Sequence, residues 1–429
     1  HPLLAESATQ FQATAYKELL PSGGPVRTAI MGEETPEKYS QAQRVQEFMN
    51  YQLMNKMEDY TPEFDQMLFY LPLAGSTFKK VYYDELMDRA VSKFVPAEDL
   101  VVNYMASDLD SCERITHIIN MSYNDFRKKQ VSGFYKDVEI MPSETSPSEV
   151  KKKYDEMEGV KPSYMDKSVK LYEFHVSLDL EGFEDKGMDG EPTGIKIPYI
   201  VTIEDSSSKI VGIRRNYDKG DEKKLKKRYF VHYKFLPGIG FYGLGLIHLI
   251  GSLSRAATQM LRQLIDAGTL ANLPAGFKSR GLKIRDDAEP IQPGEFRDID
   301  APNGDLRNAL LPLPYKEPSQ TLYSLLGFVV QSGQRFAAIT DLQVGDANQN
   351  APVGTTIALL ERGSKVMSGI HKRCHYSQKK EFKLLFDVFA DYLPETYPYS
   401  VQGADRTIKA EDFSDRVDVL PVSDPNIFS

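Results

Sequence analysis

Residues 245–271 constrain the fold most strongly, because their pattern fits only one long amphipathic helix. Apolar side chains recur at helical spacing along one face: Leu246, Leu249, Ile250, Leu253, Ala257, Met260, Leu261 and Leu264. A second face of the same helix is polar: His248, Arg255, Gln259, Arg262 and Asp266. A glycine-rich turn precedes this segment and a Pro/Gly-rich segment follows it, which are ordinary signals for the start and end of a helix.

The remainder of the second half continues in long helices. Residues 319–340 predict a helix whose apolar stripe is Leu322, Leu325, Leu326, Val329, Val330 and Phe336. Its opposite stripe is Gln320, Ser324, Gln331, Gln334 and Arg335. Between the two helices, short strands are expected at 281–285 and 295–299. A polar loop, 341–350, leads into a helix over 352–392, which would be about 60 Å long.

The first half reads as helices followed by strands, so the chain is expected to be α+β. Residues 1–70 look helical, with helices expected at 6–20, 39–59 and 63–74 and a Pro/Gly-rich stop at 21–25. A hairpin is expected from residues 78–83 and 90–95, and a second one from 195–205 and 209–216. Ser122 has the character of an N-cap for a helix over 122–130, with Asp125 three residues later. Further strands are expected near 96–102, 115–121, 169–180 and 229–235, with a helix at 148–159 and β-like pieces over 397–422.

Composition narrows the possible functions. The hydrophobic content of 41% and charged content of 26% are those of a folded protein. A net charge of −9 argues against tight binding of nucleic acid, which usually needs a basic surplus. The longest apolar run, 241–253, is too short to cross a membrane. Two cysteines far apart suggest a reducing compartment, no secretory signal is visible, and both ends are expected to be truncated.

Residues 238–243 match G-x-G-x-x-G, which leaves a nucleotide-binding enzyme open as an alternative. The motif follows an expected strand and precedes a helix, where a pyrophosphate would sit on the helix N-terminus. However, Asp266 falls inside the helix rather than after a second strand, and no parallel βαβ pattern surrounds the motif. A flexible entry to the helix explains the glycines equally well.

Two further clusters have a chemical and an ordinary interpretation. His371, Cys374 and His375 have the spacing of metal ligands on one helical face, but no further ligand lies nearby in sequence, which favours a solvated basic face. The basic run 223–228 is flanked by acidic residues, so a turn or a subunit contact is favoured over a nucleic-acid site. No catalytic motif is evident, so the chain is expected to be no enzyme and to need no cofactor or metal.

The order of helix, insertion, helix, polar loop and very long helix resembles the portal (head-to-tail connector) proteins of tailed bacteriophages, particularly those of podovirus type. The similarity covers nearly the whole chain and is strongest at residues 11–32, 235–281, 341–369 and 417–425. These stretches identify a family without identifying an active site. Another ring-forming protein of the virion, such as an adaptor, is a further alternative, although adaptors are usually short helical proteins.

The resemblance implies a dodecameric ring at one capsid vertex, through which double-stranded DNA is packaged and ejected. Its implied partners are DNA bound without sequence specificity, the large terminase subunit, a tail adaptor, the major capsid protein and, as a further candidate, a scaffolding protein; membrane is not among them. By order, 1–239 would be the wing, 240–271 and 319–340 the stem helices, 272–318 the clip, 341–351 the tunnel loop, and 352–429 the long wing helix and the start of the crown.

The resemblance also implies where functional residues should lie. The tunnel-loop residues expected to touch DNA are Gln343, Asp346, Asn348, Gln349 and Asn350. The stem residues expected to line the DNA channel are Arg255, Gln259, Arg262 and Arg335, of which the three arginines are candidates for weak phosphate contacts. The clip residues expected to bind terminase and adaptor are Arg280, Arg285, Asp286, Arg297 and Asp298. An acidic chain with few arginines suits a channel, because tight phosphate binding would hold a moving duplex back.

Overall fold

The structure is a computed structural model. It describes residues 1–140, 149–160, 168–186, 189–218, 220–272, 276–278, 283–284, 299–300, 310–312, 316–336, 353–394, 396–401, 404–414 and 417–422. The chain divides into two compact units, one formed by His1–Ser7 and Ile247–Asp346, the other by Ala8–Leu246 and Ala347–Ser429. Helices combine with antiparallel sheets, so the fold is α+β, as the sequence predicts.

The described helices lie in both halves of the chain. Their bounds are α1 Leu3–Leu19, α2 Pro36–Tyr51 (continuing as a π-helical turn, Gln52–Lys56), α3 Tyr60–Ala74, α4 Tyr123–Val131, α5 Glu149–Glu158, α6 Leu246–Asn272, α8 Gln320–Phe336 and α9 Val353–Tyr392. Ser122 caps α4 by accepting the Asp125 backbone N–H at 3.1 Å, which confirms its predicted role. Among the described residues, no helix is both long enough and apolar enough to cross a bilayer.

Two antiparallel sheets dominate the larger unit. The first has the order β3-β2-β9, with β2 Ser76–Asp84, β3 Arg89–Pro96 and β9 Phe230–Lys234. The second has the order β4-β5-β6-β7-β8, with β4 Leu100–Val102, β5 Arg114–Ser122, β6 Ser168–Leu178, β7 Ile197–Glu204 and β8 Ile210–Arg215. Both predicted hairpins are present, as β2–β3 and β7–β8.

The general expectation that residues 1–70 are helical misses one strand, which lies between the helices expected at 6–20 and 39–59. Val26–Ile30 forms β1, which pairs antiparallel with β16, Val417–Pro421. A neighbouring hairpin joins β14 (Thr396–Val401) to β15 (Ala404–Lys409). A strand of five residues has little periodicity of its own, and its partner lies at the other end of the chain. Only long-range pairing therefore decides that this segment is extended.

Two consecutive lysines of β2, Lys79 and Lys80, are buried on opposite faces of the three-stranded sheet. Phe78 packs into a buried apolar cluster with Leu100, Ile115 and Phe241. Lys79, which points to the other face, is fully buried and lies over the rings of α3, with Nζ 4.9 Å from the centre of Tyr60. Helix α9 packs against β2, β3 and β9. The core of this unit is thus a sheet whose central strand must also satisfy buried ammonium groups.

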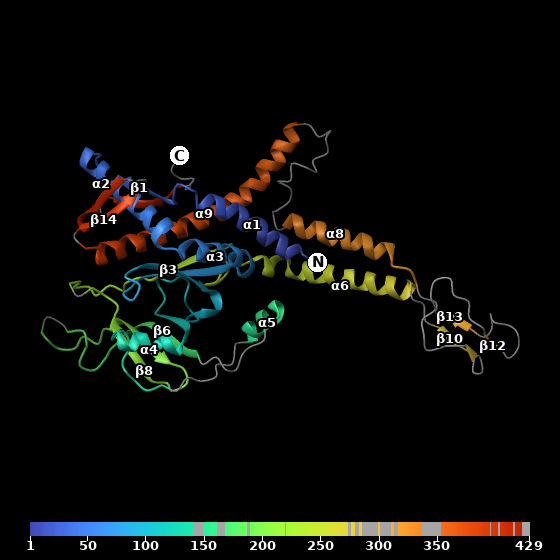
Figure 1. The fold of residues 1–429 in the computed structure, drawn as a ribbon, viewed down its shortest axis with the longest axis horizontal. Coiled ribbons are helices and arrows are strands. Elements are labelled where there is room, and N and C mark those ends of the chain that lie inside the picture. Colours follow the sequence, from blue (N-terminus) through green and yellow to red (C-terminus); the bar gives the residue numbers. More distant parts are fainter. Residues whose placement is uncertain are drawn as a thin grey trace. The chain divides into compact units, whose positions relative to one another are not determined.

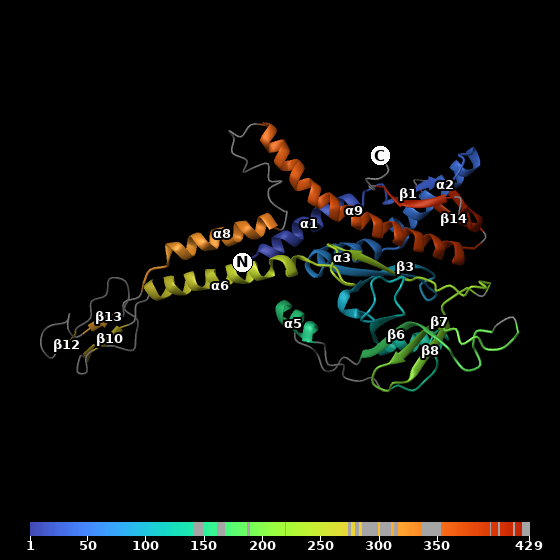
Figure 2. The same ribbon diagram turned by 180° about the vertical axis from the view of Figure 1, so that it is seen from behind.

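The smaller unit contains α6, α8 and short strands between them. β10 (Gly276–Lys278) pairs with β13 (Leu310–Pro312), and β11 (Lys283–Ile284) pairs with β12 (Ile299–Asp300). Both views show α6 and α8 running side by side (Figures 1 and 2). β11 lies within the expected strand 281–285, and β12 overlaps only the last residue of the expected strand 295–299.

Candidate functional site

The polar stripe of α6 is exposed, as its periodicity predicts. Arg255, Gln259 and Arg262 are all exposed, and so is Asp266 on the same face. Ile250, Ala257 and Met260 are buried on another side of the helix. Neither arginine forms an ion pair with another described residue. The two guanidinium groups are therefore available to bind an oxyanion from outside the chain.

The apolar residues of α6 and α8 are less covered than an ordinary helix pair would leave them. On α6, Ile247 and Ile265 are 52% and 58% exposed. On α8, Tyr323, Leu325 and Phe328 are 63%, 49% and 66% exposed. Leu325 belongs to the predicted apolar stripe of α8, yet its side chain is exposed to solvent in the single chain. Large apolar groups gathered on neighbouring helices are typical of a surface that another protein covers.

The polar stripe of α8 is described only in part. Gln320, Ser324 and Gln331 are exposed, and Gln334 is half-buried. Arg335 lies within α8, but its side chain is outside the described part of the chain. The predicted tunnel-loop residues Gln343, Asp346, Asn348, Gln349 and Asn350 also lie outside the described residues. The same holds for the predicted clip residues Arg280, Arg285, Asp286, Arg297 and Asp298.

The glycines of the 238–243 motif are explained by close backbone packing. Leu236 and Leu244 form an antiparallel bridge that closes the turn. The Gly243 backbone N–H donates to Ser76 Oγ at 2.7 Å, and a Cβ on Gly243 would lie closer than 3.0 Å to the carbonyl oxygens of Gly75 and Leu236. The preceding strand, β9, pairs antiparallel with β2. The parallel βαβ unit that a dinucleotide site needs does not surround this turn in the described part of the chain.

His371 and His375 are buried, so the expectation of a solvated basic face is wrong for them. They are 5% and 1% exposed, and Cys374 is fully buried. Both histidines face one carboxylate from α1: Glu18 pairs with His371 Nδ1, and His375 Nε2 lies 3.2 Å from Glu18 Oε1. Burial raises the pKa of the Cys374 thiol to about 12. Glu18 is distant in sequence, which is why spacing along one helix did not reveal this partner.

The Glu18–histidine contact predicts a defined dependence of stability on pH. Burial raises the pKa of Glu18, but hydrogen bonds and positive charge from His371 and His375 outweigh it and bring the pKa to about 2. Since the folded-state pKa lies below the unfolded value, the stabilisation is complete above about pH 4.5 and is lost as the pH falls toward 2. The difference in Tm between the wild type and Glu18→Gln should narrow over this interval. An exposed control, Glu34→Gln, should show no such trend, and a constant difference for Glu18→Gln would contradict the assignment.

The basic run 223–228 is largely neutralised within the chain. Lys224 pairs with Asp185, and Lys227 Nζ lies 2.6 Å from Asp218 and 3.0 Å from Asp391. Arg228 lies 3.0 Å from Asp110. Lys226 donates to three backbone carbonyls, those of Leu109, Asp110 and Cys112. These pairings leave little charge for nucleic acid, which agrees with the interpretation as a structural turn.

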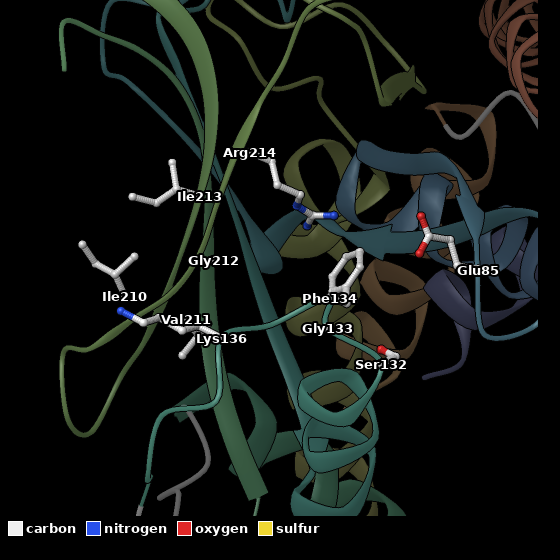
Figure 3. A pocket seen from close by; sticks show the side chains of 10 residues that line it. All are labelled: Glu85, Ser132, Gly133, Phe134, Lys136, Ile210, Val211, Gly212, Ile213 and Arg214. Carbon is white, nitrogen blue, oxygen red and sulfur yellow. The ribbon is translucent and has the colours of Figure 1, made fainter. Parts of the chain in front are cut away.

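Two adjoining cavities in the larger unit were not anticipated from sequence. Their volumes are about 690 and 830 Å³, and both are lined by Glu85, Phe134 and Arg214. Figure 3 shows Arg214 on β8 extending toward Phe134 in the loop after α4. The lining residues come from segments far apart in the chain, so no local motif could identify them.

Among the described residues, no group of three or more His, Cys, Asp or Glu side chains has the arrangement of a metal site. No protein-family model matches the chain, and a search of curated proteins likewise finds no match.

Proposed function

We propose that this chain is the subunit of a phage portal ring, the channel through which double-stranded DNA enters and leaves the capsid. One observation carries the proposal: α6 and α8 run side by side, each bearing exposed large apolar side chains in addition to a polar stripe. A single copy leaves these groups in water. Lateral packing of further copies would cover them, while the polar stripes face the interior of the ring.

The apolar seam in this proposal consists of Ile247, Ile265, Tyr323, Leu325 and Phe328. Aromatic and large aliphatic groups of this kind are the usual anchors of stable subunit contacts. Each fully covered side chain of this size contributes about 1.5–3 kcal/mol. Repeating the contact around a closed ring multiplies the gain. The tendency to assemble therefore follows from the same residues that leave the single chain incompletely covered.

The channel lining in this proposal includes Arg255, Gln259 and Arg262 on α6, with Arg335 on α8 as a further member. Duplex DNA carries one charge per about 1.7 Å of axis, so a densely basic lining would hold it fast. Two exposed arginines and neighbouring amides on α6 offer contacts that form and break readily. The tunnel-loop residues, and the clip residues that would dock terminase and the tail adaptor, complete the proposal on grounds of sequence resemblance.

Assembly provides the first experiment. Negative-stain imaging and mass photometry of the purified chain should reveal closed rings. Phe328→Asp should abolish them, because it places a charge in the proposed seam. Val131→Asp is the matched control, since Val131 is 76% exposed on α4, outside the proposed seam. A chain that remains monomeric at high concentration, or rings that survive Phe328→Asp, would contradict the proposal.

The lining assignment has a separate test. Replacement of Arg255, Arg262 and Arg335 together by glutamine should leave rings intact and alter DNA packaging or retention. The exposed Arg127→Gln variant, on α4, controls for loss of a surface arginine. If rings form and DNA handling is unchanged in the triple variant, these arginines do not contact DNA, although the ring assignment would stand.

A further inference from the structure

Two cationic side chains lie beside one aromatic ring at the cavities: Arg214 and the ring of Phe134 line both cavities, and Lys129 lines the larger one. The guanidinium carbon of Arg214 lies 3.8 Å from the centre of the Phe134 ring, and Lys129 Nζ lies 5.0 Å from the same centre. Both side chains are half-buried. A guanidinium stacked on an aromatic face keeps the N–H donors at its edge free for a planar pair of hydrogen bonds.

Neither cation forms an ion pair with a carboxylate among the described residues. Burial lowers the pKa of Lys129, and the positive charges of Lys80 and Arg214 lower it further. The negative charges of Asp84 and Glu173 act in the opposite direction. The Asp84 carboxylate accepts the backbone N–H groups of Leu86 and Met87 in its own turn. Two like charges are thus held together at reduced hydration, an arrangement that a bound anion would relieve.

The carboxylates that line the larger cavity are mostly engaged elsewhere. Glu173 Oε1 lies 2.6 Å from Lys80 Nζ and 2.7 Å from His175 Nε2. Asp125 Oδ1 lies 3.1 Å from Lys128 Nζ, and Asp218 and Asp391 are both paired with Lys227. Glu85, on the opposite wall in Figure 3, is exposed and forms no ion pair with a described residue. Glu85 is therefore a carboxylate of the described chain that could compete with an external anion.

The loop that carries Phe134 is held in place by hydrogen bonds on both sides. The Tyr135 backbone N–H donates to the Lys129 carbonyl at 3.0 Å, and the Lys136 N–H donates to the Val211 carbonyl of β8 at 2.7 Å. The Gln130 side-chain amide donates to the carbonyls of Lys136 and Val138. Phe134 and Arg214 are therefore positioned before any ligand arrives, which lowers the entropy lost on binding.

We propose that Arg214 and Lys129 form a binding site for the phosphate group of a small molecule, with the adjoining cavities holding the rest of that molecule. Arginine supplies the planar fork that matches two phosphate oxygens, and lysine supplies a point charge. Cavities of about 300–1,000 Å³ are the size that takes small-molecule ligands. The site lies outside the helices proposed to form the DNA channel. The phosphate proposal can therefore be tested independently of the portal proposal.

Binding is measured with the purified full chain by calorimetric titration of inorganic phosphate and, separately, of AMP, in chloride buffer at matched ionic strength. The wild type should bind in a saturable manner. Arg214→Gln and Lys129→Met should each weaken binding by about 10-fold or more, the loss expected for a charge-assisted contact. Glu85→Gln should tighten binding by up to roughly fivefold, because it removes a competing carboxylate.

Arg215→Gln is the matched control. It removes the same charge from the next residue of β8, which is exposed and lines neither cavity, so its affinity should equal that of the wild type. Circular dichroism establishes that each variant is folded, and Arg214→Lys serves if Arg214→Gln is not. Tighter binding of AMP than of phosphate would identify a nucleotide as the source of the phosphate, and equal affinities would identify the free ion. Absence of saturable binding of either, or equal losses in Arg214→Gln and Arg215→Gln, would overturn the proposal.

Discussion

Replacing Glu381 with alanine is expected to lower the free energy of unfolding by about 3–5 kcal/mol, the effect of removing one partner from a buried charge network. Glu381 lies on α9 and is fully buried. Its carboxylate accepts the Ser92 hydroxyl at 2.6 Å and the Tyr233 hydroxyl. Burial lowers the pKa of Lys79 nearby, and the negative charge of Glu381 is the largest influence opposing this. Alanine would remove the acceptor of both hydroxyls and the largest negative charge acting on Lys79, which would keep its hydrogen bond to the Ser92 carbonyl.

Urea unfolding followed by circular dichroism measures this effect. Glu156→Ala, an exposed position on α5, is the control and should change the free energy by less than about 0.5 kcal/mol. Lys79→Met combined with Glu381→Leu should recover part of the loss, because a buried charge pair replaced by apolar groups leaves no charge uncompensated. A Glu381→Ala midpoint close to that of the control would show that the network contributes little.

Gly75→Ala is expected to destabilise the protein by about 2–5 kcal/mol, from two separate causes. Gly75 ends α3 with a φ of +84°, a conformation that costs a residue with a side chain about 1–2 kcal/mol. In addition, its Cβ would lie closer than 3.0 Å to backbone atoms of the 243–245 turn. Overpacking against backbone adds about 1–3 kcal/mol, because neither segment can move without breaking its own hydrogen bonds.

Gly182→Ala separates these two causes. Gly182 has nearly the same φ, +82°, but nothing lies within 4 Å of an added Cβ. Only the conformational cost applies there, so this variant should lose about 1–2 kcal/mol in the same unfolding experiment. Equal losses in the two variants would show that the close approach of the 243–245 turn makes no contribution.

Features that depend on neighbours in sequence were predictable. Arg255, Gln259 and Arg262 lie on one exposed face because residues spaced three or four apart fall on the same side of a helix. The cap of α4 at Ser122 involves a residue three positions away. The β2–β3 hairpin joins strands separated by a short turn. Each of these follows from contacts within a few residues, where backbone geometry leaves few alternatives.

The residues that stabilise the larger unit were not predictable in this way. Lys79 stands in an ordinary strand pattern, yet the carboxylate with the largest effect on its pKa is Glu381, some three hundred positions later. Glu18 and the two histidines of α9 are equally remote from one another. The acidic residues that flank the basic run indicated a turn, but only the structure shows that Arg228 pairs with Asp110, more than a hundred residues earlier. The sequence does not show which charged residues will pair, and the pairing determines whether a charged side chain is neutralised within the fold or available to a partner.

From its sequence alone this chain was bound to form long amphipathic helices joined to antiparallel strands, because period and turn chemistry act over a few residues. Tertiary structure alone decided which charges are buried and compensated, that Val26–Ile30 is extended, and that Arg214 and Lys129 share the ring of Phe134. These features require contacts between segments that are distant in sequence. Such contacts depend on the packing of the whole unit rather than on any local pattern.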